Sequence, residues 1–243
     1  TASAPFSPRY GATAYAADGK LWVYGGLTGA GAYLDDLWSS PDGATWLQVS
    51  ASTSAGPRAN TTTLSFGDAA WIIGGNSTVA YPTIVSTTDG STWNRYGLPL
   101  GQIRSYPFGA VYNNELWVMG GVVSSAQTNT VLHSASGSSW TQAPAAEWSA
   151  RSAATAANFE GRLWVLGGNT SGTTTTNEVW WTTNGGDWYQ AHPLSPPWGS
   201  RQGLRSAVLG NKLYIFGGKA GSLRYNDIWY AQLPGAATEG EGE

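Results

Sequence analysis

The chain contains no cysteine, a single methionine and few charges among its 243 residues. Without cysteine, a disulfide framework, a thiolate metal site, an iron–sulfur cluster and a cysteine nucleophile are all excluded. Charged residues make up 11% of the chain and the net charge is -3, so the dense basic surface that nucleic-acid binding requires is missing. No apolar run is long enough to cross a membrane as a helix, and we expect no membrane insertion.

Glycine and tryptophan are abundant, with 33 and 14 residues, and hydrophobic residues reach 41%, enough for a sizeable core. An apolar stretch that ends in two glycines occurs five times. The five copies are LWVYGG (21–26), AWIIGG (70–75), LWVMGG (116–121), LWVLGG (163–168) and LYIFGG (213–218). Successive copies are 46 to 50 residues apart, so the whole chain consists of repeats of one unit.

Each unit repeats other features around the glycine pair. An arginine precedes the first glycine by 16 residues in every unit. Tryptophans recur at fixed places after it, and turn sequences such as Asp42-Gly43 and Asn184-Gly185 lie between them. The pattern predicts four short strands, a to d, with tight a–b and c–d turns, and no stretch has helical periodicity. Most tryptophans occupy repeat positions, which favours packing between sheets over ligand binding.

Four-stranded units repeated around an axis form a β-propeller, which protects sheet edges without disulfides. An apolar run ending in Gly-Gly, followed by spaced aromatic residues, resembles the kelch repeat over essentially the whole chain. The resemblance implies an all-β, five-bladed propeller with four-stranded blades and strand a innermost. We expect this domain over residues 1–234, followed by a flexible acidic tail or linker at 235–243. Kelch propellers more often have six or seven blades.

The fifth unit departs from the repeat because Ala237 replaces the outer tryptophan. Residues 1–8 resemble the end of a d segment, as in AAEWSA before Arg151. We therefore expect the N-terminal segment to complete the last blade and close the propeller.

Because the a–b turn is tight, the arginine that starts strand a lies at the same end of the blade as the glycine pair and the variable b–c loops. Variable loops on a regular scaffold are where binding usually occurs, so this face is the functional candidate. Five arginines are predicted around the channel mouth: Arg9, Arg58, Arg104, Arg151 and Arg201. They would bind a carboxylate, sulfate, phosphate or protein partner, or each guanidinium would bind loop carbonyls and hold neighbouring blades together.

Further candidates lie in or beside the loops. Four aromatic residues are candidate contacts to a partner or a sugar ring: Tyr33, Tyr81, Trp198 and Tyr225. For Trp198, which lies among prolines, the alternative is simple packing. Three sequons are candidate N-glycosylation sites for a secreted protein: Asn60, Asn76 and Asn169. Asn76 and Asn169 open b–c loops, whereas Asn60 falls in an inner strand, where we expect steric closure.

Catalytic constellations are scarce. His133 and His192 have no partner at metal-ligand spacing, so we expect no metal and no cofactor. Galactose-oxidase-like enzymes share the kelch architecture, but their copper radical site requires a cysteine. Sialidases are propellers with central arginines, but Glu115 and Glu160 fall at a–b turns, on the face opposite the arginines. Acidic residues that flank strand c suggest a repeated structural acid: Asp35, Asp36, Glu178 and Asp227.

The sequence favours a non-catalytic kelch propeller, secreted or at the cell surface. It would act as a protein-interaction, adhesive or structural assembly module through the loop face, with a protein or glycan partner or by self-assembly. The alternative is a carbohydrate-binding, lectin-like propeller. A sialidase-like glycoside hydrolase is less favoured.

Overall fold

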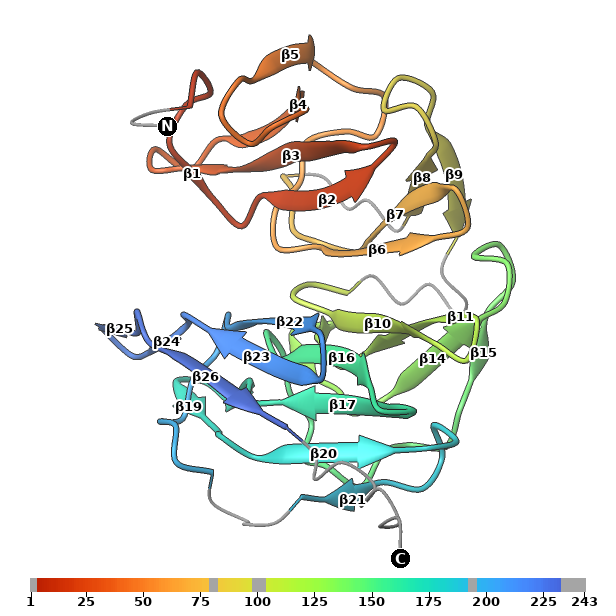
Figure 1. Cartoon of the computed structure of the whole chain (residues 1–243), viewed down its shortest axis with the longest axis vertical. Helices are drawn as coiled ribbons and strands as arrows, with labels where there is room; N and C mark the ends of the chain where they lie inside the picture. The colour runs from red at the N-terminus through yellow and green to blue at the C-terminus, as the bar shows by residue number, and fades with distance from the viewer. Residues whose placement is uncertain (1–3, 79–82, 98–103, 192–195, 233–243) are drawn as a thin grey trace, which may run out of the picture.

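The computed structural model describes residues 4–78, 83–97, 104–191 and 196–232, and the fold in these ranges is all-β. Five antiparallel sheets, one from each sequence repeat, stand around a common axis (Figure 1). The chain is a five-bladed β-propeller, as the repeats predict. Among the described residues, no helix is long and apolar enough to span a membrane. The predicted tail at 235–243 lies outside the described residues.

Each blade runs from its inner to its outer strand in chain order. Blade 1 contains β1 (Arg9–Tyr10), β2 (Thr13–Ala17), β3 (Lys20–Thr28), β4 (Tyr33–Ser40) and β5 (Leu47–Ser50). Blade 2 contains β6 (Thr62–Phe66), β7 (Ala69–Ile73), β8 (Thr83–Thr87) and β9 (Asn94–Gly97). Blade 3 contains β10 (Phe108–Tyr112), β11 (Glu115–Met119), β14 (Val131–Ser134) and β15 (Thr141–Gln142).

Blade 4 contains β16 (Thr155–Phe159), β17 (Arg162–Leu166), β20 (Val179–Thr182) and β21 (Tyr189–Gln190). Blade 5 contains β22 (Arg205–Leu209), β23 (Lys212–Phe216) and β26 (Ile228–Ala231). Small hairpins in the b–c loops add β12 (Val122–Val123), β13 (Ala126–Gln127), β18 (Asn169–Ser171), β19 (Thr174–Thr175), β24 (Lys219–Ala220) and β25 (Leu223–Arg224).

The turns have the geometry that their residues predict. In blade 4, Phe159 pairs with Arg162 across Glu160-Gly161, and both turn residues have positive φ. Two residues with positive φ give the twist that a two-residue hairpin needs. In the c–d turn of blade 1, Asp42 accepts the backbone N–H groups of two following residues, and these hydrogen bonds lower its pKa to about 2.

The core consists of wedges between neighbouring blades. Trp117 of blade 3 packs in one apolar cluster with Leu163 and Val165 of blade 4, and the indole is 5% exposed. Gly185, in the c–d turn of blade 4, lies directly over this indole: a Cβ there would be 2.1 Å from a Trp117 ring carbon. The repeated tryptophans on strand b therefore fill the wedges, and the turn glycine leaves room for them.

A chain of backbone hydrogen bonds joins the inner ends of the blades. Its members follow each repeat arginine by two residues and have positive φ: Gly11, Asn60, Tyr106, Ala153 and Gly203. Each amide from Asn60 onward donates to the carbonyl of the preceding member, with N–O distances of 2.7 to 3.2 Å. These bonds hold successive blades in one repeated geometry.

The predicted closure of the ring by the N-terminal segment is wrong. In the described part of the chain the fifth sheet has three strands, and none comes from the N-terminus. Phe6 instead packs on its own blade, with its ring centroid 5.7 Å from that of Trp38 and 5.3 Å from that of Trp46. The N-terminal segment stays there because two aromatic rings already offer Phe6 an apolar surface.

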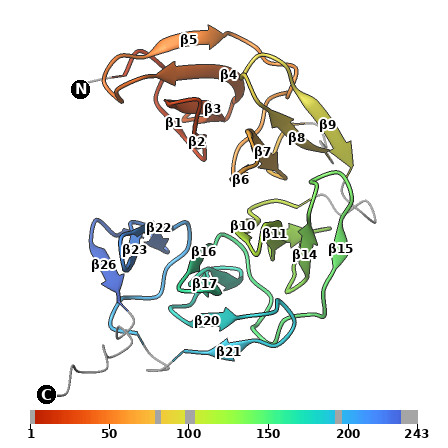
Figure 2. The same ribbon diagram turned by 45° about the vertical axis from the view of Figure 1, so that its right-hand side comes forward.

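The five blades consequently form an arc with one open side (Figure 2). Inner strands pack side by side from β2 to β6, β10, β16 and β22. Within the described residues, β22 and β2 have no comparable contact. We call this open side, between blade 5 and blade 1, the break.

Candidate functional site

The repeat arginines lie at the loop end of the blades, as the strand order predicts. Four of the five bind the carbonyl of the first glycine in their own Gly-Gly pair, 16 residues later. This bond joins Arg9 to Gly25, Arg104 to Gly120, Arg151 to Gly167 and Arg201 to Gly217, with N–O distances of 2.9 to 3.1 Å. The guanidinium thus satisfies a backbone carbonyl that lies within β3 in blade 1 and one residue beyond β11, β17 and β23 in blades 3 to 5.

Three of these arginines also form ion pairs with an acid at the start of strand c. The pairs are Arg9 with Asp36, Arg151 with Glu178 and Arg201 with Asp227. In each pair, the tryptophan two residues after the acid donates its indole N–H to the same carboxylate, over 2.8 to 3.1 Å. The prediction of a repeated structural acid therefore holds for Asp36, Glu178 and Asp227.

The ion pairs change the acidity of the carboxylates. Hydrogen bonds from Arg201 lower the pKa of Asp227 to about 2, against the opposing effect of desolvation. Burial alone would raise the pKa of Glu178, but hydrogen bonds from Arg151 and Trp180 lower it overall. At Arg104, Thr130 takes the place of the acid, and burial lowers the pKa of this arginine to about 10.

The arginines have almost no accessible surface. Arg58, Arg104, Arg151 and Arg201 are at most 1% exposed, and the side chain of Arg9 is 4% exposed. None of the five lines the cavity at the channel mouth. This geometry corresponds to the interpretation in which guanidinium groups bind carbonyls and acids within the blades. An anion in the cavity would not touch them.

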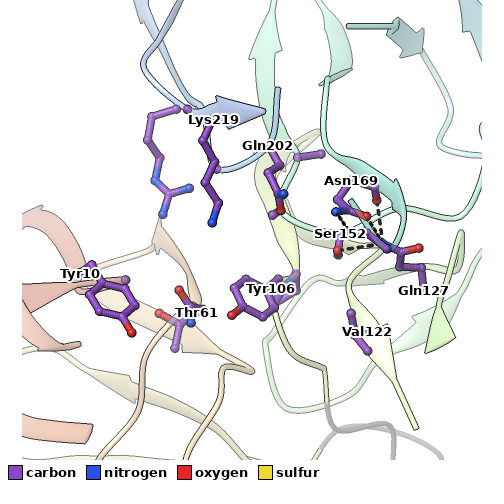
Figure 3. Close-up of a pocket in the computed structure, with 18 of the residues that line it drawn as sticks. Tyr10, Thr61, Tyr106, Val122, Gln127, Ser152, Asn169, Gln202 and Lys219 are labelled. Carbon is purple, nitrogen blue, oxygen red and sulfur yellow. Dashed lines mark hydrogen bonds between the residues drawn. The ribbon is translucent and has the colours of Figure 1, made fainter. Parts of the chain in front are cut away.

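The channel mouth is a cavity of about 960 Å³ to which all five blades contribute (Figure 3). Tyr10 of blade 1 and Tyr106 of blade 3 are exposed there, by 57% and 37%. Lys219, Arg205 and Arg224, all from blade 5, bring three cations to its lining, and no acidic residue lines it among the described residues. The cavity therefore combines aromatic surface with positive charge.

Polar side chains cover the opposite wall of the cavity. The Gln127 amide nitrogen donates to the Asn169 side-chain oxygen over 2.6 Å, and the Asn169 amide donates to the Gly172 carbonyl. Ser152 lies within 3.4 Å of the Gln127 nitrogen. These bonds fix the polar side chains of blades 3 and 4, whereas the cations of the lining come from blade 5.

The predicted loop aromatic residues differ in their placement. Trp198 is 6% exposed and belongs to the core between blades 4 and 5, so it is not a surface contact. The Tyr225 ring is covered by Arg201, whose guanidinium carbon is 3.8 Å from the ring centroid. Tyr33 is half-buried in β4. Tyr81 lies outside the described residues.

Asn76 and Asn169, which we expected to be open loop sites, are half-buried and buried, and Asn60, which we expected to be closed, is half-buried. Asn169 is 5% exposed and its amide nitrogen is already bound to Gly172, so this acceptor is closed. Asn76 is half-buried where its backbone pairs with Ala59. Asn60 is half-buried with a positive φ at the cavity wall. Glycosylation at these positions stays a prediction that the packing of Asn169 opposes.

The titratable groups outside the loop face gather into no larger cluster. His133 binds Glu115 over 2.7 Å and stacks on Trp117, with 4.6 Å between ring centroids. The pair lies at the a–b turn end, away from the cavity, as the strand order predicts. His192 lies outside the described residues. Within the ranges that the structure covers, no group of three or more His, Asp or Glu side chains is arranged to hold a metal ion.

Sequence reasoning placed the arginines and the b–c loops on the face that holds the cavity, but it did not identify the residues that line the cavity. In blades 3, 4 and 5 the residue directly after the Gly-Gly pair lines the cavity, and its identity changes from Val122 to Asn169 and Lys219. A search for repeated residues passes over such a position because it does not repeat. The signal that could have identified these lining residues is a fixed position in the repeat at which the residue type varies between blades.

Comparison with known proteins adds no name to the fold. No protein-family model matches the chain, and no curated protein is detectably similar to it. The class that the structure defines is the β-propeller, a scaffold that presents loops and a central cavity at one face.

Proposed function

We propose that this propeller, whose repeats resemble kelch repeats, is a non-catalytic interaction module that binds an acidic segment of a partner protein in the central cavity. The observation that carries the proposal is the lining of the cavity, where Arg205, Lys219 and Arg224 stand without a lining acid in the described residues. A surface of one charge sign on a rigid rim favours a partner of the opposite sign.

The cavity suits a partner better than it suits catalysis. Propeller loops form a wide and shared surface on a rigid scaffold, and all five blades contribute to this one. The acids at the start of strand c, Asp36, Glu178 and Asp227, are each engaged by an arginine. A general acid or base would need a carboxylate that is free to exchange protons.

Binding of a short polyglutamate peptide, measured by calorimetry at low ionic strength, tests the proposal. Lys219→Gln and Arg224→Gln should each weaken binding by about threefold to tenfold, and added salt should do the same. Lys20→Gln is the matched control, because Lys20 is an exposed lysine at an a–b turn. Equal affinities for the three variants would refute the cavity as the site.

A glycan is the second candidate ligand, and the exposed Tyr10 and Tyr106 side chains favour it. Aromatic faces stack on sugar rings, and the cations of blade 5 would select acidic sugars. On a glycan array, Tyr10→Ala should lose a signal that Tyr189→Ala keeps, since Tyr189 is 52% exposed on the outer strand of blade 4. A fluorogenic sialoside serves as the test for hydrolysis, and turnover would contradict a non-catalytic role.

We also propose that the protein acts outside the cell or at its surface as an adhesive or assembly unit. The low charge, the many Ser, Thr and Gly residues and the three sequons support this location. Fractionation of cells that express the tagged natural protein would test it, and retention in the cytosol would contradict it.

A further inference from the structure

At four junctions, neighbouring blades form a complete interface with each other. At the break, the corresponding surfaces of blade 5 and blade 1 have no partner among the described residues. At each complete junction, the second glycine of the Gly-Gly pair donates its N–H to the arginine carbonyl of the next blade, as from Gly168 to Arg201 over 2.9 Å. The counterpart from Gly218 to Arg9 is not formed in the described structure. Both groups keep the orientation of the repeat, since the neighbouring strand pairs are intact.

The inner chain of hydrogen bonds stops at the same place. Gly203 donates to the Ala153 carbonyl over 2.7 Å, which is the fourth step of the series. A fifth step would run from the Gly11 amide to the Gly203 carbonyl, and the described residues do not make it. The break therefore offers one free donor and one free acceptor at its inner edge.

Blade 5 presents an apolar face to the break. In blade 4, Phe159 and Leu166 are 3% and 5% exposed because blade 5 covers them. Leu209 and Phe216 hold the same strand positions in blade 5 and are 73% and 40% exposed. Ile228, which pairs with Phe216, is 69% exposed. A contiguous apolar face of this kind marks an interaction site.

Blade 1 presents the opposite half. Leu21 is 44% exposed, although its counterpart Leu163 is completely buried by the preceding blade. At a complete junction, a turn glycine lies under the tryptophan of the preceding blade, as Gly185 does with Trp117. Gly43 holds this position in blade 1, and among the described residues only Leu21 of its own blade is within contact distance. The seat for an aromatic side chain is open.

We propose that the break binds one additional four-stranded β-sheet of the same repeat type, presented by a partner polypeptide. One such unit could contact both blades at the break. The aromatic residue of its strand b would pack on Gly43 of blade 1, and its opposite apolar face would cover Ile228 of blade 5. The five sheets surround most of the axis in Figure 2, and the open part of the ring adjoins blades 5 and 1. The blades on either side of the break do not cover each other.

The probe is a peptide with the sequence of residues 151–198, the complete fourth repeat. Because the chain has no cysteine, Ile228→Cys places its only thiol on the face of blade 5. In the free protein this thiol should react with a maleimide at the rate of an exposed thiol. Saturating peptide should slow the reaction by about tenfold or more, and native mass spectrometry should show one peptide per chain.

Leu47 provides the matched control, because it is also 69% exposed but lies on the outer strand of blade 1. The Leu47→Cys thiol should keep its reactivity when peptide is added. Ile228→Asp should weaken peptide binding by about tenfold or more, since a charge would enter an apolar contact, whereas Leu47→Asp should not. A chain with residues 151–198 repeated after Gln232 should protect the Ile228→Cys thiol without free peptide.

Three results would overturn the proposal. The first is the absence of a one-to-one complex together with an unprotected thiol in the extended chain. The second is a slow thiol in a free monomer, which would mean that blade 1 of the same chain covers blade 5. The third is a dimer that Ile228→Asp dissociates, which would make a second copy the occupant.

Discussion

Replacing Gly185 by alanine tests the physical basis of the blade packing. The residue has φ of 75°, and an added Cβ would lie 2.1 Å from a ring carbon of Trp117. The left-handed backbone costs a non-glycine residue roughly 1–2 kcal/mol. Forcing a methyl group into a filled core adds about 1–3 kcal/mol. We expect a total loss of about 2–5 kcal/mol in the free energy of unfolding.

Gly161→Ala separates the two contributions. Gly161 has φ of 67°, and nothing lies within 4 Å of the position of its Cβ. This variant should lose the backbone contribution alone, about 1–2 kcal/mol. Urea unfolding followed by tryptophan fluorescence measures both variants, and equal denaturant slopes would show that the comparison is valid.

The indole itself is the last part of this test. Trp117→Leu removes the ring that the added methyl group meets, so Gly185→Ala should cost only the backbone contribution in that background. The interaction energy from the double-mutant cycle should then be about 1–3 kcal/mol. Equal losses for Gly185→Ala and Gly161→Ala, or an interaction energy near zero, would refute wedge packing as the reason for this glycine.

Three further predictions concern stability. Arg151→Leu should lower the free energy of unfolding by about 2–4 kcal/mol in urea melts, because the substitution removes the buried guanidinium that binds the Gly167 carbonyl and Glu178. Folding lowers the pKa of Asp227 from 3.8 to about 2, so its contribution to stability is complete above pH 4 and lost as the pH falls toward 2. Acid unfolding should therefore be less steep in Asp227→Asn. Leu163→Ala should cost about 3–5 kcal/mol by calorimetry, whereas Leu47→Ala should cost almost nothing, because their exposed fractions are 0% and 69%.

The repeats make much of the fold predictable. The Gly-Gly pairs and turn sequences determine where strands end, and the spacing of Trp117 and its equivalents gives the wedge contacts between blades. The free end of the chain was not predictable in this way. A repeat pattern identifies a segment that resembles strand d, but it does not show which sheet accepts that segment. In the structure, Phe6 packs against Trp38 and Trp46 of its own blade.

The candidate site was predictable in position but not in composition. The arginines occur at the predicted face, and their partners follow from the acids at Asp36, Glu178 and Asp227. Burial of those arginines depends on how the surrounding carbonyls and tryptophans pack, which spacing alone does not reveal. The cavity residues, such as Lys219, differ between repeats and leave no periodic signal.

The break and the cavity share an edge, so binding at one should affect the other. Gly11, Gly203 and Gly218 line the cavity and also carry the backbone groups that the break leaves unpaired. An additional blade would complete the cavity wall beside Lys219 and exclude water from it, which strengthens attraction between charges. We therefore expect polyglutamate to bind about threefold to tenfold more tightly when the 151–198 peptide is present.

Linkage requires the reverse effect to have the same size, so saturating polyglutamate should strengthen peptide binding by the same factor. Calorimetric titrations in both orders measure the two factors. Lys219→Gln should reduce both factors together, because it removes a charge from the completed wall, whereas Lys20→Gln should change neither. If both ligands bind and neither affects the other, the additional sheet does not form the wall of the cavity, and the two sites act independently.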